Sequence, residues 1–290
     1  MWYDKIMKKQ KVFVIGGPTA SGKSSLAIQL AEAVGGSVVN GDAIQVYRDL
    51  QILSARPDEK ETTRVPHYLY GEVDAWTNFS LADWLARIKE IVPNLTNPVI
   101  VGGTGLYLNT LLEGINEIPD VDPDVRQKVR TMPMDEVKAL VRECPFVDQQ
   151  RLRRALEVQL STGKTLAFFY RRPKKKILDA DFQLIHVLPP REVVYQNCET
   201  RFYRMMKQNV VDEVRHLIKI KATGGVLKAI GVPEIKAFLQ GEFSEEEMAE
   251  RVITATRQYA KRQMTWFRHH GDPKYLIENV SQVKIKDITK

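Results

Sequence analysis

The stretch Gly16-Gly17-Pro18-Thr19-Ala20-Ser21-Gly22-Lys23-Ser24 decides the fold of this 290-residue chain. Within it, Gly17-x4-Gly22-Lys23-Ser24 matches the phosphate-binding loop pattern in full. A β-type run at 11–16 comes before it, and a helical run at 25–31 follows it. This order of strand, loop and helix distinguishes a true phosphate loop from the alternative, a tight glycine turn that binds nothing.

A loop of this kind binds phosphate for simple geometric reasons. Its glycines let backbone N–H groups turn inward, and the helix N-terminus adds partial positive charge. The Lys23 ammonium would reach phosphate oxygens, and the Ser24 hydroxyl would join the coordination of Mg²⁺. The loop therefore predicts a polyphosphate ligand, but it does not say what reaction that ligand undergoes.

Alternating strand and helix patterns continue through the first 115 or so residues. Short β runs at 37–40 and 98–101 end in glycines, and the polar residues Asp42 and Thr104 follow them. Such alternation predicts an α/β fold, a phosphate-loop-type parallel sheet flanked by helices with a helical insertion domain. Ligands of these sheets bind at the carboxyl ends of the strands, so Asp42 and Thr104 are expected to face the phosphate loop.

Prolines punctuate the chain after residue 115, and the pattern becomes helical. Helices are expected at 124–130, 134–143 and 149–162, and a β run at 182–188 rejoins the sheet. Further helices are expected at 191–208, 209–221, 233–239 and 244–269, the last with a capping-box start. The expected domains are a catalytic core of residues 1–115 and 181–290 and a helical insertion of residues 116–180.

Composition narrows the class of protein. The chain is 27% charged and 43% hydrophobic, and it has no apolar run of roughly the 20 residues that cross a bilayer. The N-terminus lacks the apolar core of a signal peptide, which favours the cytoplasm. The two cysteines, Cys144 and Cys198, lie far apart and suggest neither a disulfide framework nor a cysteine-based metal site.

Positive charge is concentrated in one segment of a chain whose net charge is +7. Residues 150–176 contain nine basic residues and one acid, Glu157. The basic residues are Arg151, Arg153, Arg154, Lys164, Arg171, Arg172, Lys174, Lys175 and Lys176. Such a patch attracts a polyanion such as a nucleic acid, and the alternative is a solvated surface segment.

Asp42 is the acid that follows a strand end in the early part of the chain. It could act as general base towards a nucleophile of the acceptor, as an outer-shell partner of Mg²⁺, or as a cap for a helix at 43–47. The guanine-binding Asn-Lys-x-Asp signature is missing, which argues against a GTPase. No run of four apolar residues ends in the Asp-Glu pair of a motor ATPase.

Five stretches, in this order, resemble the tRNA dimethylallyltransferase family. They are GGPTASGKS at 16–24, NGDAIQVY at 40–47, VGGTGLY at 101–107, QRLRRALEV at 150–158 and ATRQYAKRQMTWFR at 255–268. The phosphate loop alone is not specific to one family. Together with the other four stretches, which extend to about residue 268, it is highly specific.

The resemblance implies a bacterial-type enzyme that moves a dimethylallyl group from dimethylallyl diphosphate to the exocyclic amine of an adenosine. That adenosine lies beside the anticodon of tRNA, on its 3′ side. The implied donor site is the loop itself: Gly17, Pro18, Thr19, Ala20, Ser21, Gly22, Lys23 and Ser24, with Ser24 also on Mg²⁺. Such a cradle also stabilises charge on a leaving diphosphate.

Further roles follow from the same resemblance. Asp42 would accept the proton of the adenine amine or hydrogen-bond to it, and Thr104 and Arg201 would contact the diphosphate. The alternatives are a helix cap for Thr104 and a surface ion pair for Arg201. The implied tRNA contacts are Asp42, Ala43, Ile44, Gln45, Arg126, Gln150, Arg151, Leu152, Arg153, Arg154, Lys228 and Gly231.

The chain departs from the family pattern in two places. The family has a longer stretch with a His-Pro-Asn-Asp-like turn before the 150–158 motif, whereas here Cys144-Pro145-Phe146-Val147-Asp148 leads straight into it. An aromatic residue usually follows the glycine of the 227–231 stretch, and here it is Val232. The expectation is a monomeric tRNA-modifying enzyme without membrane contact, and the runner-up is a small-molecule kinase that binds ATP.

Overall fold

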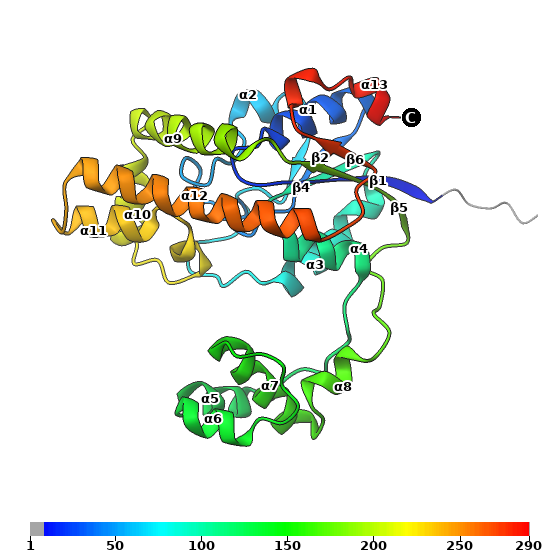
Figure 1. The fold of residues 1–290 in the computed structure, drawn as a ribbon, viewed down its shortest axis with the longest axis vertical. Coiled ribbons are helices and arrows are strands. Elements are labelled where there is room, and N and C mark those ends of the chain that lie inside the picture. Colours follow the sequence, from blue (N-terminus) through cyan, green and yellow to red (C-terminus); the bar gives the residue numbers. More distant parts are fainter. Residues whose placement is uncertain (1–8, 290) are drawn as a thin grey trace, which may run out of the picture. The chain divides into compact units, whose positions relative to one another are not determined.

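The computed structural model describes residues 9–289, which form two compact units. The core unit contains the chain up to Leu112 and from Leu178 onward, and the insertion unit is Glu113–Ile177. The insertion begins and ends slightly earlier in the chain than the 116–180 expected from the sequence. Figure 1 shows both units.

A parallel six-stranded sheet forms the centre of the core unit, in the order β3-β2-β4-β1-β5-β6. The strands are β1 (Gln10–Gly16), β2 (Ser37–Asn40), β3 (His67–Tyr68), β4 (Pro98–Gly102), β5 (Ala180–Val187) and β6 (Tyr275–Ile277). In β1 the residues from Val12 to Gly16 are all buried, as is typical of a parallel strand covered on both faces.

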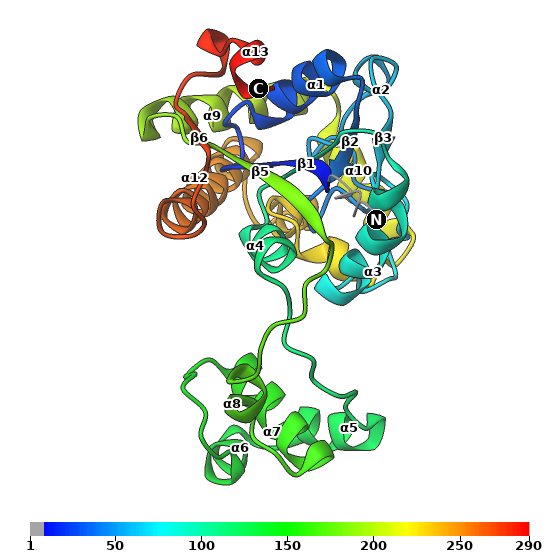
Figure 2. The ribbon, with the colours of Figure 1, turned by 90° about the vertical axis from the view of Figure 1, so that its right-hand side faces the viewer.

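Helices cover both faces of this sheet. The helices of the core unit are α1 (Lys23–Val34), α2 (Glu59–Thr62), α3 (Leu81–Ile91), α4 (Gly105–Glu113), α9 (Arg191–Lys207), α10 (Val210–Lys219), α11 (Val232–Leu239), α12 (Glu245–His269) and α13 (Ile285–Ile288). Three 3₁₀ turns span Val92–Asn94, Gly225–Lys228 and Val280–Gln282. Figure 2 shows α1 and α13 on one face and α3 and α4 on the other.

The strand order determines where a ligand can bind. After β1 the chain crosses to β2 on one side of the sheet, and after β4 it crosses β1 to reach β5 on the other side. Ligands of open parallel sheets bind at the carboxyl ends of the strands where the direction of winding reverses. The loop after β1, which contains Lys23 at its end, lies at this point.

The 25-residue helix α12 packs along α9 and closely against the loops at the strand ends. A Cβ atom added to Gly103 would lie 2.4 Å from Gln263 Nε2, and one added to Gly105 would lie 2.3 Å from the Trp266 ring. A side chain at either position would therefore displace Gln263 or Trp266, and glycine allows α12 to approach these loops closely.

The insertion unit is a small helical body with its own core. Its helices are α5 (Pro123–Thr131), α6 (Met134–Leu140), α7 (Gln149–Thr162) and α8 (Leu166–Tyr170). The fully buried side chains of Val129, Val137, Leu156 and Val158 form its centre. Helix α6 ends at Leu140 rather than at the expected residue 143, because Val141 is already extended.

Within residues 9–289 there is no helix with both the length and the apolar character needed to cross a membrane.

Candidate functional site

The phosphate loop has the backbone geometry of an anion cradle. Gly22 caps α1 with φ +88°, a left-handed conformation that glycine adopts without strain. Helix α1 begins at Lys23, and its first turn contains no acidic side chain. The N–H groups of this first turn, with the partial positive charge of the helix end, face the loop. The loop predicted from the sequence therefore has the form that phosphate binding requires.

Lys23 is held inside this loop. Its Nζ donates a hydrogen bond to the carbonyl oxygen of Pro18 at 3.1 Å. Burial lowers the pKa of Lys23 to about 8, although the nearby charge of Asp42 acts in the opposite direction. A partly buried ammonium with a lowered pKa gains stability when an anion arrives, since the anion replaces the hydration that burial removed.

Arg201 brings a second, partly buried cation to the loop from helix α9. Its Nη2 donates a hydrogen bond to Thr19 Oγ1 at 2.5 Å. Burial lowers the pKa of Arg201, partly offset by the charge of Asp42. The alternative of a surface ion pair is wrong, since Arg201 contacts the loop and, within residues 9–289, pairs with no carboxylate.

Asp42 and Thr104 lie at the ends of the neighbouring strands β2 and β4, as the topology predicted. Thr104 Oγ1 accepts a hydrogen bond from the backbone N–H of Ala43 at 3.1 Å, which joins the two loops. Asp42 Oδ1 accepts one from the N–H of Ile44 at 2.9 Å. Residues 43–47 form turns, so the interpretation of Asp42 as a helix cap is wrong.

The charge of Asp42 acts on three phenols around the site, of which Tyr107 is buried and Tyr70 and Tyr259 are partly buried. Together with burial, it raises the pKa of Tyr70 and of Tyr259, and it contributes to raising the pKa of Tyr107 to about 12. These phenols therefore stay protonated at neutral pH. The Tyr259 hydroxyl also interacts with Thr104 and Gln263.

Gln263 of α12 connects the phosphate loop with the loop after β4. Its Oε1 accepts a hydrogen bond from the N–H of Thr19 at 2.8 Å, and its Nε2 donates one to the carbonyl oxygen of Gly103 at 2.8 Å. The side chain is only 6% exposed. This residue lies within the 255–268 motif, and the sequence indicates no role for it. The signal that could have identified it is an amide side chain among the basic residues of that motif.

Ser21 adds a polar atom that points to a ligand. Its Oγ is buried and has no hydrogen-bond partner among the described residues. Buried hydroxyls are normally hydrogen-bonded, so an unpaired one inside a phosphate loop favours a bound group that supplies the partner. Within residues 9–289, three or more His, Cys, Asp or Glu side chains nowhere gather into a metal site.

The expected tRNA contacts of the core unit lie close together. Gly231 has a φ of +96°, and a Cβ atom added to it would lie 2.8 Å from the Leu53 side chain, so a larger residue there would strain the backbone and displace Leu53. Gln45 Nε2 donates to the carbonyl oxygens of Ser54 and Ala55. Ile44 and Leu53 pack against the hydrophobic cluster that contains Ala229 and Val232. Lys228 is exposed on this surface, whereas Ala43 is partly buried.

Glu213 of α10 fixes the loop that carries these residues. Its carboxylate accepts hydrogen bonds from three successive backbone N–H groups, those of Gln51, Ile52 and Leu53, at 2.5, 2.8 and 2.9 Å. An ionised carboxylate that accepts several backbone donors makes strong, short hydrogen bonds. Glu213, which lies outside the 43–56 loop, therefore helps to fix the conformation of that loop.

The expected tRNA contacts of the insertion unit differ in exposure. Gln150 and Arg151 of α7 are exposed, and so is Arg126 of α5. Leu152 is 7% exposed and belongs to the core of the unit, so it supports the helix rather than offering a surface. Arg153 donates to the carbonyl oxygen of Val129, and Arg154 pairs with Glu157.

Acids from outside the 150–176 segment neutralise part of its charge. Lys175 pairs with Glu117 at 2.6 Å, Lys174 with Glu113, Arg171 with Glu143 at 3.8 Å and Arg151 with Asp148 at 3.5 Å. The insertion unit contains 14 basic and 10 acidic residues. The net charge of the insertion unit is positive, but the excess of basic residues is smaller than the nine-to-one ratio in residues 150–176 suggested.

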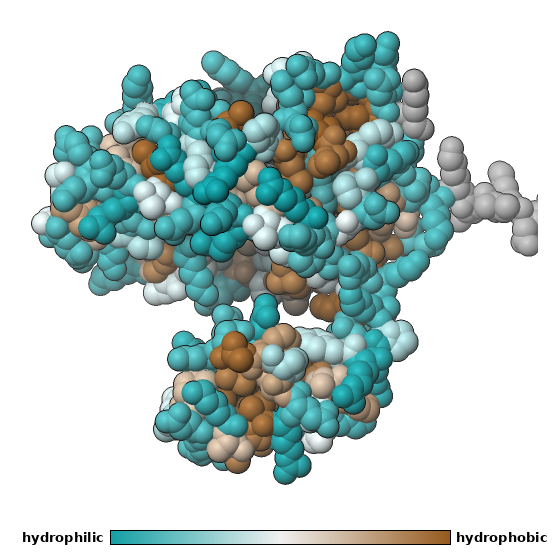
Figure 3. Space-filling view, in the orientation of Figure 1, coloured by the Kyte–Doolittle hydropathy of each residue, from teal (hydrophilic) through white to brown (hydrophobic). Residues whose placement is uncertain are grey.

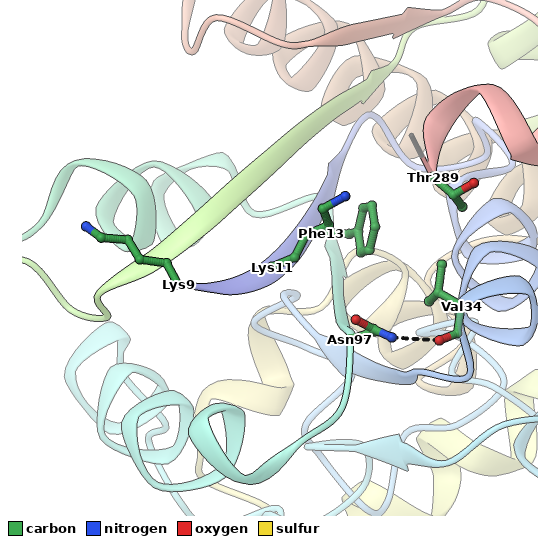
Figure 4. A pocket seen from close by; sticks show the side chains of 6 residues that line it. All are labelled: Lys9, Lys11, Phe13, Val34, Asn97 and Thr289. Atoms are coloured by element: carbon green, nitrogen blue, oxygen red, sulfur yellow. Dashed lines mark hydrogen bonds between the residues drawn. The ribbon is translucent and has the colours of Figure 1, made fainter. Parts of the chain in front are cut away.

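A hollow of about 430 Å³ lies away from this site, at the amino ends of β1 and β4. Its lining residues, drawn in Figure 4, are Lys9, Lys11, Phe13, Val34, Asn97 and Thr289. The phosphate loop follows the opposite, carboxyl end of β1, so the hollow is not part of the candidate site.

Two family models match the chain. The model described as IPP transferase matches residues 45–270, and the model described as Isopentenyl transferase matches residues 10–72. Among curated proteins, the tRNA dimethylallyltransferase of Rhizobium etli is 42% identical and covers 93% of this chain and 97% of its own. That of Zymomonas mobilis is 39% identical, with 97% and 95% covered.

Solved structures agree in fold. The tRNA isopentenylpyrophosphate transferase of Bacillus halodurans has a TM-score of 0.71 at 27% identity and covers 97% of this chain and 94% of its own. A eukaryotic dimethylallyltransferase described as acting on tRNA has a TM-score of 0.81 at 27% identity and covers 94% of this chain and 75% of its own.

Proposed function

Because this chain belongs to the IPP transferase family, we propose that it is a tRNA dimethylallyltransferase. It transfers a dimethylallyl group from dimethylallyl diphosphate to the exocyclic amine of the adenosine 3′-adjacent to the anticodon of tRNA. Diphosphate is released. The interpretation as an ATP-using kinase is not favoured, because the relatives are tRNA dimethylallyltransferases or isopentenylpyrophosphate transferases.

One observation supports the donor site most strongly: two partly buried cations, Lys23 and Arg201, meet at a phosphate loop whose first helical turn holds no acid. Two partly buried positive charges at one loop favour the binding of an anion. A diphosphate supplies it, and the backbone N–H groups contact its remaining oxygens. Its negative charge increases as the dimethylallyl carbon departs, so these groups bind the leaving diphosphate more strongly than the intact donor.

Asp42 is proposed to receive the proton. The adenine nitrogen forms a bond to the dimethylallyl carbon while the bond from that carbon to the diphosphate oxygen breaks, and its electron pair leaves with the diphosphate. The amine must then lose one proton, which passes to the Asp42 carboxylate. The hydrogen bond from the Ile44 N–H at 2.9 Å orients the carboxylate. The hydrogen bond from the Ala43 N–H to Thr104 Oγ1 fixes the loop that carries it.

Mg²⁺ is the proposed cofactor, with the Ser24 hydroxyl as its protein ligand. The phosphate-loop donor set suits this ion, since a hydroxyl is a hard oxygen ligand and the remaining ligands would come from the diphosphate and water. When bound, the ion neutralises part of the negative charge on the diphosphate. This chain's own residues bind and orient the donor and accept the proton.

The tRNA anticodon stem-loop is the proposed partner. The surface around Gln45, Lys228 and Gly231 in the core unit and the exposed residues of α7 are proposed to contact it. The target base must leave its stack to reach a donor held in the loop. We further propose that the enzyme acts as a monomer in the cytoplasm, where its substrate is found.

Transfer to tRNA can be tested directly. Unmodified tRNA is incubated with the protein, Mg²⁺ and either dimethylallyl diphosphate or ATP, and the nucleosides are analysed by mass spectrometry. A prenylated adenosine is expected only with dimethylallyl diphosphate, and not with a tRNA that has guanosine at the target position. Lack of product with a competent tRNA would refute the proposal, and phosphorylated product with ATP would revive the kinase interpretation.

Asp42→Asn tests the proton acceptor. The amide keeps the shape of the side chain but cannot take up a proton, so turnover should fall by about 10²- to 10⁴-fold. Donor affinity should change little, because Asp42 does not contact the phosphates in this scheme. Turnover within twofold of wild type would exclude Asp42 as the base.

A further inference from the structure

The insertion unit holds aromatic rings beneath cationic side chains at its surface. The Arg151 guanidinium lies 4.8 Å from the centre of the Phe146 ring. The Lys164 ammonium and the Arg172 guanidinium lie 4.4 and 4.7 Å from the centre of the Phe168 ring. Both rings are partly buried, while the three cations are exposed. Figure 3 shows apolar residues interspersed with hydrophilic ones on the visible face of this unit.

Tyr170 extends the first of these groups towards solvent. Its ring packs edge-on against Phe146, with centroids 6.3 Å apart and planes at 81°, and the residue remains 49% exposed. We call the six residues together the aromatic–cation surface: Phe146, Arg151, Lys164, Phe168, Tyr170 and Arg172. Phe146 belongs to the short 144–148 turn in which this chain departs from the family pattern.

Charge is distributed unevenly over the aromatic–cation surface. Near Tyr170, Arg151 is paired with Asp148 at 3.5 Å and Arg171 with Glu143 at 3.8 Å. Within residues 9–289, Lys164 and Arg172 form no ion pair with a carboxylate. The surface therefore offers planar groups with balanced charge at one end and uncompensated positive charge at the other.

We propose that the aromatic–cation surface binds unpaired nucleotides of RNA. A base stacks on Tyr170 beside the Arg151 guanidinium, and Lys164 and Arg172 contact adjacent phosphates. This inference rests on the proposed function, because it assigns a part of the tRNA to a surface of the insertion unit. Unpaired RNA is recognised by stacking on aromatic and guanidinium planes together with phosphate contacts, and every base has a face that can stack.

Paired RNA does not fit the surface in the same way. In a duplex each base is already stacked on its neighbours, so an exposed phenol such as Tyr170 finds no free base face. The Asp148 and Glu143 carboxylates beside it also disfavour a purely phosphate contact at this end. The chemistry of the surface therefore selects loop nucleotides over stem nucleotides.

Two RNA hairpins with the same stem separate stacking from charge. One has the natural anticodon loop, and in the other the loop nucleotides are abasic, so that phosphates remain but bases are lost. Binding to the full-length protein is measured by fluorescence anisotropy at several salt concentrations. Tyr170→Ala should weaken binding of the natural hairpin by about 5- to 100-fold. It should leave binding of the abasic hairpin and the salt dependence unchanged.

Other variants supply controls. Tyr170→Phe keeps the ring and should bind like wild type, and Leu140→Ala, at an exposed apolar residue of α6, should have no effect. Lys164→Ala and Arg172→Ala should weaken binding of both hairpins and reduce the salt slope by about one unit each. The inference is overturned if Tyr170→Ala binds both hairpins like wild type, or loses affinity equally for both.

An assay of prenyl transfer distinguishes a failure of this inference from a failure of the proposed function. With Tyr170→Ala, KM for tRNA should rise while kcat at saturating tRNA stays unchanged. If wild-type protein transfers the group and Tyr170→Ala leaves KM unchanged, the inference alone fails. If wild-type protein binds the natural loop through Tyr170 but transfers no dimethylallyl group, the proposed function alone fails.

Discussion

Arg201 Nη2 lies 2.5 Å from Thr19 Oγ1, across 182 residues of sequence. This hydrogen bond fixes the guanidinium of α9 to the phosphate loop before a ligand arrives. The N–H of the same threonine donates to Gln263 of α12, so one residue joins the loop to two helices from the far end of the chain. The positions of the donor-site cations are therefore set by elements distant in sequence.

Arg201→Lys should raise the donor KM and lower kcat/KM by about 10- to 100-fold, because an ammonium lacks the planar fork that holds Thr19 and a phosphate together. Thr19→Val removes the hydroxyl that positions Arg201. The double variant should lose less than the two single losses combined, with a coupling of about 0.5–3 kcal/mol in a double-mutant cycle. Strict additivity would show that the two side chains act independently.

Donor affinity should fall as the pH rises through about 8, since Lys23 has a pKa of about 8 and only its protonated form attracts the diphosphate. Above that value each pH unit should weaken binding by up to about tenfold, because one proton must be taken up. Calorimetric titration of the donor without tRNA, from about one pH unit below the Lys23 pKa to about one and a half above it, measures this. Lys23→Arg keeps its charge throughout and should lose the pH dependence; a flat wild-type profile would contradict the assignment.

Gln263→Leu should weaken donor binding, because the Thr19 N–H and the Gly103 carbonyl lose their partner in a buried place. An unsatisfied buried group costs about 1–3 kcal/mol, so both donor affinity and the unfolding midpoint should fall. Gln263→Glu keeps the acceptor for Thr19 but not the donor for Gly103, and it separates the two bonds. Gln258→Leu, at an exposed position of α12, is the matched control and should behave like wild type.

Stability should decrease as the pH falls below about 6.5, the ordinary pKa of histidine. His186 is 2% exposed and its ring packs on Phe267, and burial lowers its pKa. The unfolded chain therefore binds this proton at a higher pH than the folded chain, so acid favours unfolding, by at most about 1.4 kcal/mol per pH unit for one proton. His186→Asn should show a shallower dependence of the unfolding midpoint on pH, and His269→Asn, which is exposed, should not.

The sequence predicts well those helices and strands whose apolar pattern or capping residues lie within or next to the element itself. The buried strands around the phosphate loop are continuous apolar runs, and α7 spans the predicted residues 149–162 because Asp148 caps it and Gly163 ends it in a left-handed conformation. The edge strands β3 and β6, with two and three residues, carry no such pattern and depend on pairing with β2 and β5. Helix α3 was not predicted, although Ser80 and Asp83 form a capping box.

The residues of the candidate site also differ in how far their positions could be predicted from the sequence. Lys23, Asp42 and Thr104 follow strand ends, so topology alone brings them together. The bonds of Gln263 cannot be read from the sequence, because its partners lie 244 and 160 residues away and depend on how α12 packs on the glycines at 103 and 105. Likewise, the ion pairs of Lys174 and Lys175 with Glu113 and Glu117 come from folding, and they reduce a charge that the sequence count overstates.

The contact between Thr19 and Gln263 also sets the order of events during synthesis. The ribosome completes the phosphate loop early, but the residue that clamps it is made 244 positions later. At a synthesis rate of roughly 5–20 residues per second, Gln263 is added on the order of 12 to 50 seconds after Thr19. A nascent chain that has not yet reached α12 therefore has the phosphate-loop sequence without the hydrogen bonds that fix it. The proposed donor site therefore becomes complete only after α12 has been synthesised.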